Sequence, residues 1–195
     1  MSEYDISGLS FILLEKSPQM RRILRDILKT FNVSDIREAR DVEQAWDMFR
    51  ESPPDVVLSD WAPGLDGLEF VERVRRGDDT PDPYVPVIVV SGNTELRQVV
   101  EARDAGMTEF LAKPVSAKLL YLRIKAVIER YRVFIRTADF FGPDRRRRRV
   151  DFSGSERRDH SNSASDRRIE QLPFPGAERR QGYPGFISAD TRATR

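Results

Sequence analysis

The chain has 195 residues, with 33 basic and 32 acidic side chains, a formal net charge of +1 and 39% hydrophobic residues, which predicts one ordinary domain plus additional unpacked chain. It contains no cysteine, which excludes disulfides, thiolate metal sites and a cysteine nucleophile. Its single histidine, His160, lies in polar surroundings and argues against catalytic triads and multi-histidine metal sites. The longest apolar runs, residues 9–14 and 85–90, reach about a third of a membrane span, and no signal segment opens the chain. We therefore expect a cytoplasmic protein without a membrane span.

Two periodicities alternate along the first 136 residues: short apolar runs typical of buried strands, and apolar residues spaced three or four apart, typical of helices. In chain order they predict strand 9–14, helix 18–31, strand 33–39, helix 42–49, strand 55–59, helix 68–75, strand 85–90, helix 95–106, strand 109–112 and helix 117–131. Ser17 and Asp41 stand at expected N-caps, and Pro18 at a first helical position. Strict alternation of this kind predicts an α/β fold, a doubly wound parallel sheet of five strands with helices on both faces.

The composition changes near residue 137. Residues 1–136 hold 20 basic and 23 acidic side chains, and residues 137–195 hold 13 and 9, so the balance moves from −3 to +4. Every basic residue of the second part is arginine, and its aliphatic residues are too few to offset the entropy of ordering the backbone. We expect one domain over 1–136 and an arginine-rich, largely disordered tail over 137–195.

Four polar residues directly follow predicted strands: Glu15, Asp60, Ser91 and Lys113. Ligands of such sheets bind at the carboxyl ends of the strands, where the strand order reverses, so these side chains are expected at one rim. Two acids, a hydroxyl and a lysine suit phosphoryl transfer to a carboxylate. The alternative is that strand ends are polar because they meet water, which is reasonable for any one of the four and weak for all of them together.

The sequence from about residue 8 to 136 resembles the response-regulator receiver domain, which has a flavodoxin-like fold. The strings that carry the resemblance are Ile12-Leu13-Leu14-Glu15, Leu58-Ser59-Asp60-Trp61, Leu65-Asp66-Gly67, Val89-Val90-Ser91-Gly92 and Phe110-Leu111-Ala112-Lys113-Pro114. The resemblance implies that Asp60 accepts a phosphoryl group from a histidine kinase or phosphotransfer protein. It also implies that Lys113 contacts the phosphate and that Ser91 and Phe110 form the switch pair. Such a protein is a signalling adaptor without a folded output domain, and its only chemistry is self-catalysed phosphotransfer and dephosphorylation.

The resemblance further implies Mg²⁺ held by Glu15, Asp60 and the carbonyl of Ala62, but the sequence departs from the family pattern twice. Lys16 stands where a second acid is usual, and two unit charges 4 Å apart interact by about 4 kcal/mol at an effective dielectric of 20. The loop between Asp60 and Gly67 is also one residue shorter than usual. The alternative function is therefore a degenerate, phosphorylation-independent receiver in which Lys16 replaces the metal and the tail carries the signal.

A glycine, an acid and two arginines recur along the tail, at residues 142–146, 154–158 and 176–180, with a partial copy at 165–168. Guanidinium groups bind phosphate and the guanine edge, and an acid can accept from guanine. The tail resembles the arginine-rich extension of chemotaxis-like receivers that bind cyclic di-GMP and dock on the flagellar motor. The residues implied as ligand contacts are Asp144, Arg145, Arg146, Arg147, Arg148, Arg157 and Arg158.

Two other interpretations of the tail stay open: a segment that binds protein or no ligand, and a less favoured RNA contact. Residues 139–141, Asp-Phe-Phe, are expected either to dock back on the domain or to pack against the bases of a ligand.

Overall fold

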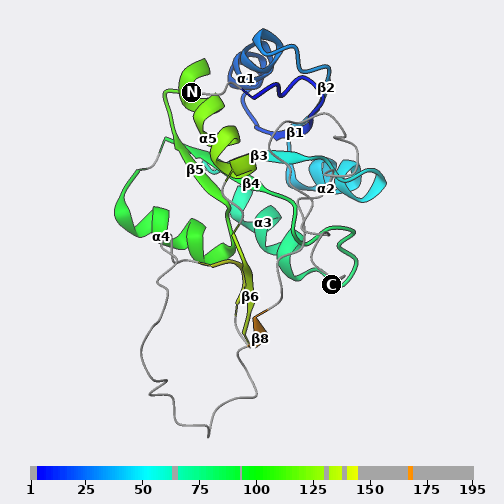
Figure 1. The fold of residues 1–195 in the computed structure, drawn as a ribbon, viewed down its shortest axis with the longest axis vertical. Helices are drawn as coiled ribbons and strands as arrows, with labels where there is room; N and C mark the ends of the chain where they lie inside the picture. Colours follow the sequence, from blue (N-terminus) through cyan, green and yellow to red (C-terminus); the bar gives the residue numbers. More distant parts are fainter. Residues whose placement is uncertain are drawn as a thin grey trace, which may run out of the picture.

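The computed structural model describes residues 4–62, 66–92, 94–129, 132–137, 140–144 and 167–168. Strands and helices alternate through the domain as the sequence predicts (Figure 1). In chain order the elements are β1 (Ser10–Leu14), α1 (Pro18–Thr30), β2 (Asp35–Ala39), α2 (Val42–Glu51), β3 (Val56–Asp60), α3 (Gly67–Arg76), β4 (Val87–Ser91), α4 (Leu96–Ala105), β5 (Glu109–Ala112) and α5 (Ala117–Glu129). The predicted α/β class is confirmed.

The five strands form one parallel sheet in the order β2-β1-β3-β4-β5. All four neighbouring pairs are parallel, for example Leu14 beside Ser59 and Asp60 beside Val90. The strand order reverses between β1 and β3, because the chain first winds outward to β2 and then returns to the other side of β1. The doubly wound sheet is therefore as predicted, and it places the carboxyl ends of β1 and β3 side by side.

Two hydrophobic clusters fill the two faces of the sheet. One joins Ile12 and Leu14 of β1 to the side chains of α2, α3 and α4, and the other joins Phe11 and Leu13 to those of α1 and α5. Successive residues of a strand point to opposite faces, so burial on both faces explains why the strands read as continuous apolar runs.

The predicted helix caps are confirmed at α1 and α2, where Ser17 Oγ accepts from the amide of Met20 and an oxygen of Asp41 accepts from that of Gln44. Helix α4 differs, because it begins at Leu96 with Glu95 as its N-cap and no side-chain cap bond. Strand β4 begins at Val87 and not at residue 85. Proline lacks the amide hydrogen that a strand donates to its neighbour, and residue 86 is proline.

A second, small sheet follows α5. It consists of β6 (Phe134–Arg136), β7 (Phe141–Pro143) and β8 (Arg167–Arg168) in the antiparallel order β7-β6-β8. Phe141 is only 5% exposed, and β7 packs against α3, close to where Figure 1 draws β6 below α3 and α4.

The packed chain therefore continues past residue 136, into the start of the segment expected to be largely disordered. Residues 139–141 were expected either to dock back on the domain or to pack against the bases of a ligand. Phe141 docks back on the domain, because its side chain is buried. Asp139 lies outside the described residues, as does Tyr131, the last residue of the apolar face predicted for the fifth helix. None of the described helices is long and apolar enough to cross a membrane.

Candidate functional site

The four polar residues predicted at strand ends meet at the carboxyl edge of the sheet. Glu15 follows β1, Asp60 and Ser91 close β3 and β4, and Lys113 follows β5. The parallel register places Ser91 beside Ala112, the residue before Lys113, and these four strands are neighbours in the sheet. The predicted convergence on one rim is thus what the fold produces.

Lys113 joins the two carboxylates of the site. Its Nζ donates to Oδ1 of Asp60 at 2.6 Å and to Oε2 of Glu15 at 2.9 Å. The two acidic side chains are 3% and 2% exposed, respectively. Water screens buried ion pairs far less than surface pairs. The ammonium of Lys113 therefore offsets much of the repulsion between the carboxylates of Asp60 and Glu15.

Burial sets the acid–base properties of this cluster. Loss of water raises the pKa of Asp60, and the neighbouring charge of Glu15 adds to the rise, although the hydrogen bond from Lys113 opposes it. For Lys113, burial works against the ammonium, but hydrogen bonds to Asp60 and Glu15 outweigh it and raise its pKa. The lysine therefore stays charged at neutral pH and presents a fixed cation beside Asp60.

The two predicted switch residues lie on the neighbouring strands β4 and β5. Ser91 is buried, and its Oγ donates to the carbonyl oxygen of Trp61 at 2.8 Å. Phe110 of β5 is half-buried and packs against the core cluster formed with α2, α3 and α4. In this state the Ser91 hydroxyl is thus engaged with the loop that follows β3.

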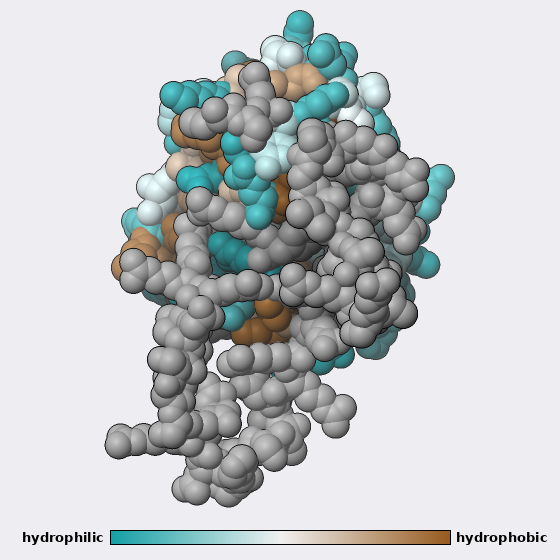
Figure 2. Space-filling model, in the orientation of Figure 1, coloured by the Kyte–Doolittle hydropathy of each residue, from teal (hydrophilic) through white to brown (hydrophobic). Residues whose placement is uncertain are grey.

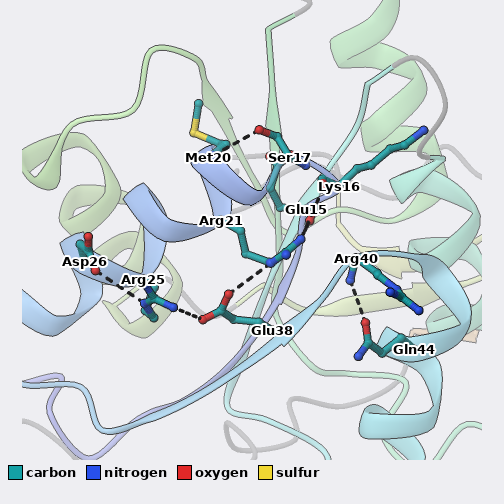
Figure 3. A network of polar contacts seen from close by, with 10 residues as sticks. All are labelled: Glu15, Lys16, Ser17, Met20, Arg21, Arg25, Asp26, Glu38, Arg40 and Gln44. Carbon is teal, nitrogen blue, oxygen red and sulfur yellow. Dashed lines mark hydrogen bonds and ion pairs between the residues drawn. The ribbon is translucent and has the colours of Figure 1, made fainter.

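Lys16 does not lie between the carboxylates. Its side chain is exposed, and Figure 3 shows it extending away from Glu15 and Arg21. The ammonium that pairs with both acids in this structure is that of Lys113, and the replacement of a metal ion by Lys16 stays a prediction.

The residues that the sequence predicts as ligands of a divalent cation are Glu15 and Asp60, both buried, and Ala62, which is half-buried. Within the part of the chain that the structure describes, no cluster of three or more acidic, histidine or cysteine side chains could hold a metal. Mg²⁺ commonly binds one or two carboxylates and keeps several waters, so the pair of carboxylates on Glu15 and Asp60, which share the ammonium of Lys113, fits this ion.

Two residues position the site in ways that were not predicted: Gly67, named in the sequence only as part of a family string, and Arg21, which was not named. Gly67, the first residue of α3, lies so close to β3 that a Cβ there would overlap the carbonyl oxygen of Asp60. Arg21 of α1 donates to the carbonyl oxygen of Glu15 at 2.6 Å. The Asp-Gly pair at 66–67 could have indicated the close approach at Gly67. The contact of Arg21 could not be predicted, because it depends on how α1 packs.

The predicted tail contacts lie mostly beyond what the structure describes. Asp144 is described, and its amide donates to the carbonyl oxygen of Val133 at 2.7 Å. The arginines expected as ligand contacts lie outside the described residues: Arg145, Arg146, Arg147, Arg148, Arg157 and Arg158.

A parallel five-stranded sheet with an acid pair and a lysine at its carboxyl rim is the arrangement of a signal receiver, and the chain belongs to the response regulator receiver domain family, whose model matches residues 11–125. Among its relatives, the chain is 28% identical over 123 residues to the chemotaxis protein CheY of Pseudomonas aeruginosa, covering 63% of this chain and 98% of that one. It is 25% identical over 124 residues to the chemotaxis protein CheY-3 of Vibrio cholerae, covering 63% and 94%.

Solved structures share this fold. A signal receiver domain of a DNA binding response regulator from Colwellia psychrerythraea superposes with a TM-score of 0.56 at 25% identity, covering 63% of this chain and 100% of that one. The chemotaxis protein CheY4 of Vibrio cholerae gives 0.55 at 23% identity, covering 62% and 99%. The resemblance to receiver domains seen in the sequence is confirmed, and the small sheet from Phe134 onward lies beyond the matched residues 11–125.

Proposed function

We propose that this protein is a response regulator whose Asp60 accepts a phosphoryl group from a histidine kinase or a phosphotransfer protein, and that it acts as a signalling adaptor and not as a metabolic enzyme. The observation that supports this proposal most strongly is the ammonium of Lys113, which lies 2.6 Å from Oδ1 of Asp60. A buried carboxylate beside a fixed cation at the rim of this sheet suits transfer of a negatively charged group.

The proposed reaction moves one phosphoryl group. An Asp60 oxygen attacks phosphorus, the bond from phosphorus to the donor breaks, and the donor leaves with its electron pair. Lys113 turns its ammonium to the phosphoryl oxygens, and Ser91 exchanges the carbonyl oxygen of Trp61 for a phosphoryl oxygen. Mg²⁺ held by Glu15, Asp60 and Ala62 would supply further neutralisation of phosphoryl charge.

Incubation with acetyl phosphate and Mg²⁺ is expected to add one phosphoryl group to the intact mass and to change the fluorescence of Trp61, whose carbonyl the Ser91 hydroxyl must release. Asp60→Asn should abolish both changes, because its amide is a far poorer nucleophile than a carboxylate. Asp47→Asn, at an exposed acid of α2, is the control and should leave both intact. An unmodified wild-type protein would favour the phosphorylation-independent alternative.

We also propose that the arginine-rich tail binds cyclic di-GMP. Support comes from the recurring glycine, acid and arginine pattern, since guanidinium groups suit both phosphate and guanine. Because the amide of Asp144 is bonded to the backbone of residue 133, the first arginine run begins at an anchored point of the domain.

Calorimetry on the full chain tests the tail. Replacing Arg145, Arg146, Arg147 and Arg148 with alanine is expected to weaken cyclic di-GMP binding about tenfold or more, because charge-assisted bonds are lost, with little effect on GTP. Equal affinity for a short RNA that falls steeply with added salt would instead favour the nucleic-acid alternative.

A protein target, such as a component of the flagellar motor, is also proposed. Support comes from large apolar side chains exposed on α4 and α5, namely Leu96, Leu119 and Leu122. Leu96 is 79% exposed, and Figure 2 shows hydrophobic surface on the side of the molecule where α4 lies. An apolar surface flanked by polar residues is typical of a protein docking site.

A further inference from the structure

We propose that Arg21 is a positioning residue for the phosphoacceptor site, and that Glu38 holds Arg21 in the orientation that fixes Glu15. This inference deepens the proposed function and rests on it, because Glu15 shares the cation of Lys113 with Asp60. Arg21 bonds the backbone of Glu15 and the side chain of Glu38, so we expect both residues to act through Glu15.

The guanidinium of Arg21 reaches two elements at once. Its Nη1 donates to the carbonyl oxygen of Glu15 at 2.6 Å, and its Nε pairs with Oε2 of Glu38 at 3.2 Å (Figure 3). Arginine presents several donors in one rigid plane, which a lysine ammonium cannot match. The turn between β1 and α1 is thereby tied to β2 through a single side chain.

Glu38 is itself fixed from a second side. Its other oxygen accepts from Nη1 of Arg25 at 2.8 Å, and the next residue, Ala39, accepts the amide of Glu15 at 3.0 Å. The side chain of Arg21 is 18% exposed and that of Glu38 27% exposed, so water screens their interaction less than it screens a surface pair.

The orientation of Glu15 depends on this turn. Oε1 of Glu15 accepts from the amide of Ser17 at 2.8 Å while Oε2 accepts from Lys113, so the carboxylate is aimed only when residues 15–17 keep their conformation. The exposed Lys16 occupies the next position, which leaves Glu15 as the one carboxylate that this turn supplies to the site.

The test compares full-length variants. Arg21→Ala is expected to shift the NMR signal of the Lys113 ammonium, which loses a fixed partner, and to weaken Mg²⁺ binding, followed by Trp61 fluorescence, about tenfold or more, as for other residues that orient ligands. Glu38→Gln should produce a smaller change of the same kind. Arg21→Lys should not restore wild-type behaviour, because its ammonium cannot reach both partners.

The matched control is Arg22→Ala, at the next residue of the same helix, whose side chain is 76% exposed and pairs with Asp26 at 3.7 Å. It should leave the ammonium signal and Mg²⁺ binding unchanged. A lower melting temperature of Arg21→Ala with a wild-type Lys113 signal and wild-type Mg²⁺ affinity would show a merely structural role and overturn the inference. If the wild type is never phosphorylated but Arg21→Ala still shifts the Lys113 signal, the proposed function fails and the positioning role stands.

Discussion

Gly67→Ala is expected to lower the free energy of unfolding by about 3 kcal/mol or more, at the upper end of what overpacking costs, and to impair phosphorylation of Asp60. A Cβ at this position would overlap the carbonyl oxygen of Asp60 and lie 2.6 Å from Oγ of Ser59. One of these neighbours is backbone inside the sheet and the other is fully buried, so neither can move aside without shifting β3.

The local structure makes this contact hard to relieve. Ser59 Oγ donates to the carbonyl oxygen of Gly67 at 3.1 Å, and Asp66 caps α3 by accepting from the amides of Leu68 and Glu69. The helix start is thus fixed to the end of β3. An added methyl must push α3 and Asp60 apart, which displaces the phosphoacceptor from Lys113.

Chemical denaturation measures the stability change, and the rate of modification by acetyl phosphate measures the displacement of Asp60. Gly8→Ala is the control, because a Cβ there meets nothing within 4 Å, and it should stay within about 0.5 kcal/mol of the wild type. Equal stability of the two variants would show that the approach of α3 to β3 is looser than the structure indicates.

The sheet and the four rim residues could be predicted from the sequence because both depend on local patterns. Strands buried on both faces appear in the sequence as apolar runs. A polar residue directly after such a run lies at the carboxyl edge of the sheet, independently of the side chains that it contacts. Asp60 and Lys113 are 53 residues apart in sequence, yet the parallel order alone brings them together.

The orientation of side chains could not be predicted in the same way. Lys16 follows Glu15 directly, and only the conformation of the turn decides that Lys16 points to solvent while Lys113 lies between the acids. The bond from Arg21 to Glu15 likewise depends on the packing of α1 against β2. Such contacts arise from tertiary structure that residue spacing in one sequence does not encode.

The small sheet was also missed, because its strands are shorter than the runs on which strand prediction depends. Phe134–Arg136 and Phe141–Pro143 have three residues each, and the surrounding arginine-rich composition favours disorder. The aromatic residues at 134 and 141 were the available signal. They form a cluster with Tyr84, with ring centroids between 5.1 and 5.6 Å apart.

Phe141→Ala is expected to release β7 from the domain while the five-stranded sheet stays intact. The Phe141 ring packs against Tyr84 and Phe134, and the guanidinium of Arg136 lies 4.5 Å from its centroid. Removing the ring deletes most of the apolar contact that holds β7, since the hairpin has only three paired residues in each strand.

The energetic loss should be smaller than for a phenylalanine of the main core, because the guanidinium of Arg75 lies 5.3 Å from the ring centroid of Phe134 in the same hairpin. The side chain of Arg75 donates to the carbonyl oxygens of Gly106 and Pro83, while its Nη2 is buried without a hydrogen-bond partner among the described residues. Burial lowers the pKa of Arg75 to about 9, so the group remains charged at neutral pH. Opening the hairpin hydrates this charge and offsets part of the lost packing.

We therefore expect Phe141→Ala to reduce the free energy of unfolding by about 2 kcal/mol, below the 3 to 5 kcal/mol common for a buried phenylalanine. Hydrogen exchange at the amides of Thr137 and Asp144, which bond within the hairpin, should become fast, while exchange in β3 and β4 stays slow. Leu96→Ala, at a side chain 79% exposed, is the control and should change neither. Slow exchange at both hairpin amides in Phe141→Ala would mean that backbone pairing, and not this aromatic anchor, attaches the tail to the receiver.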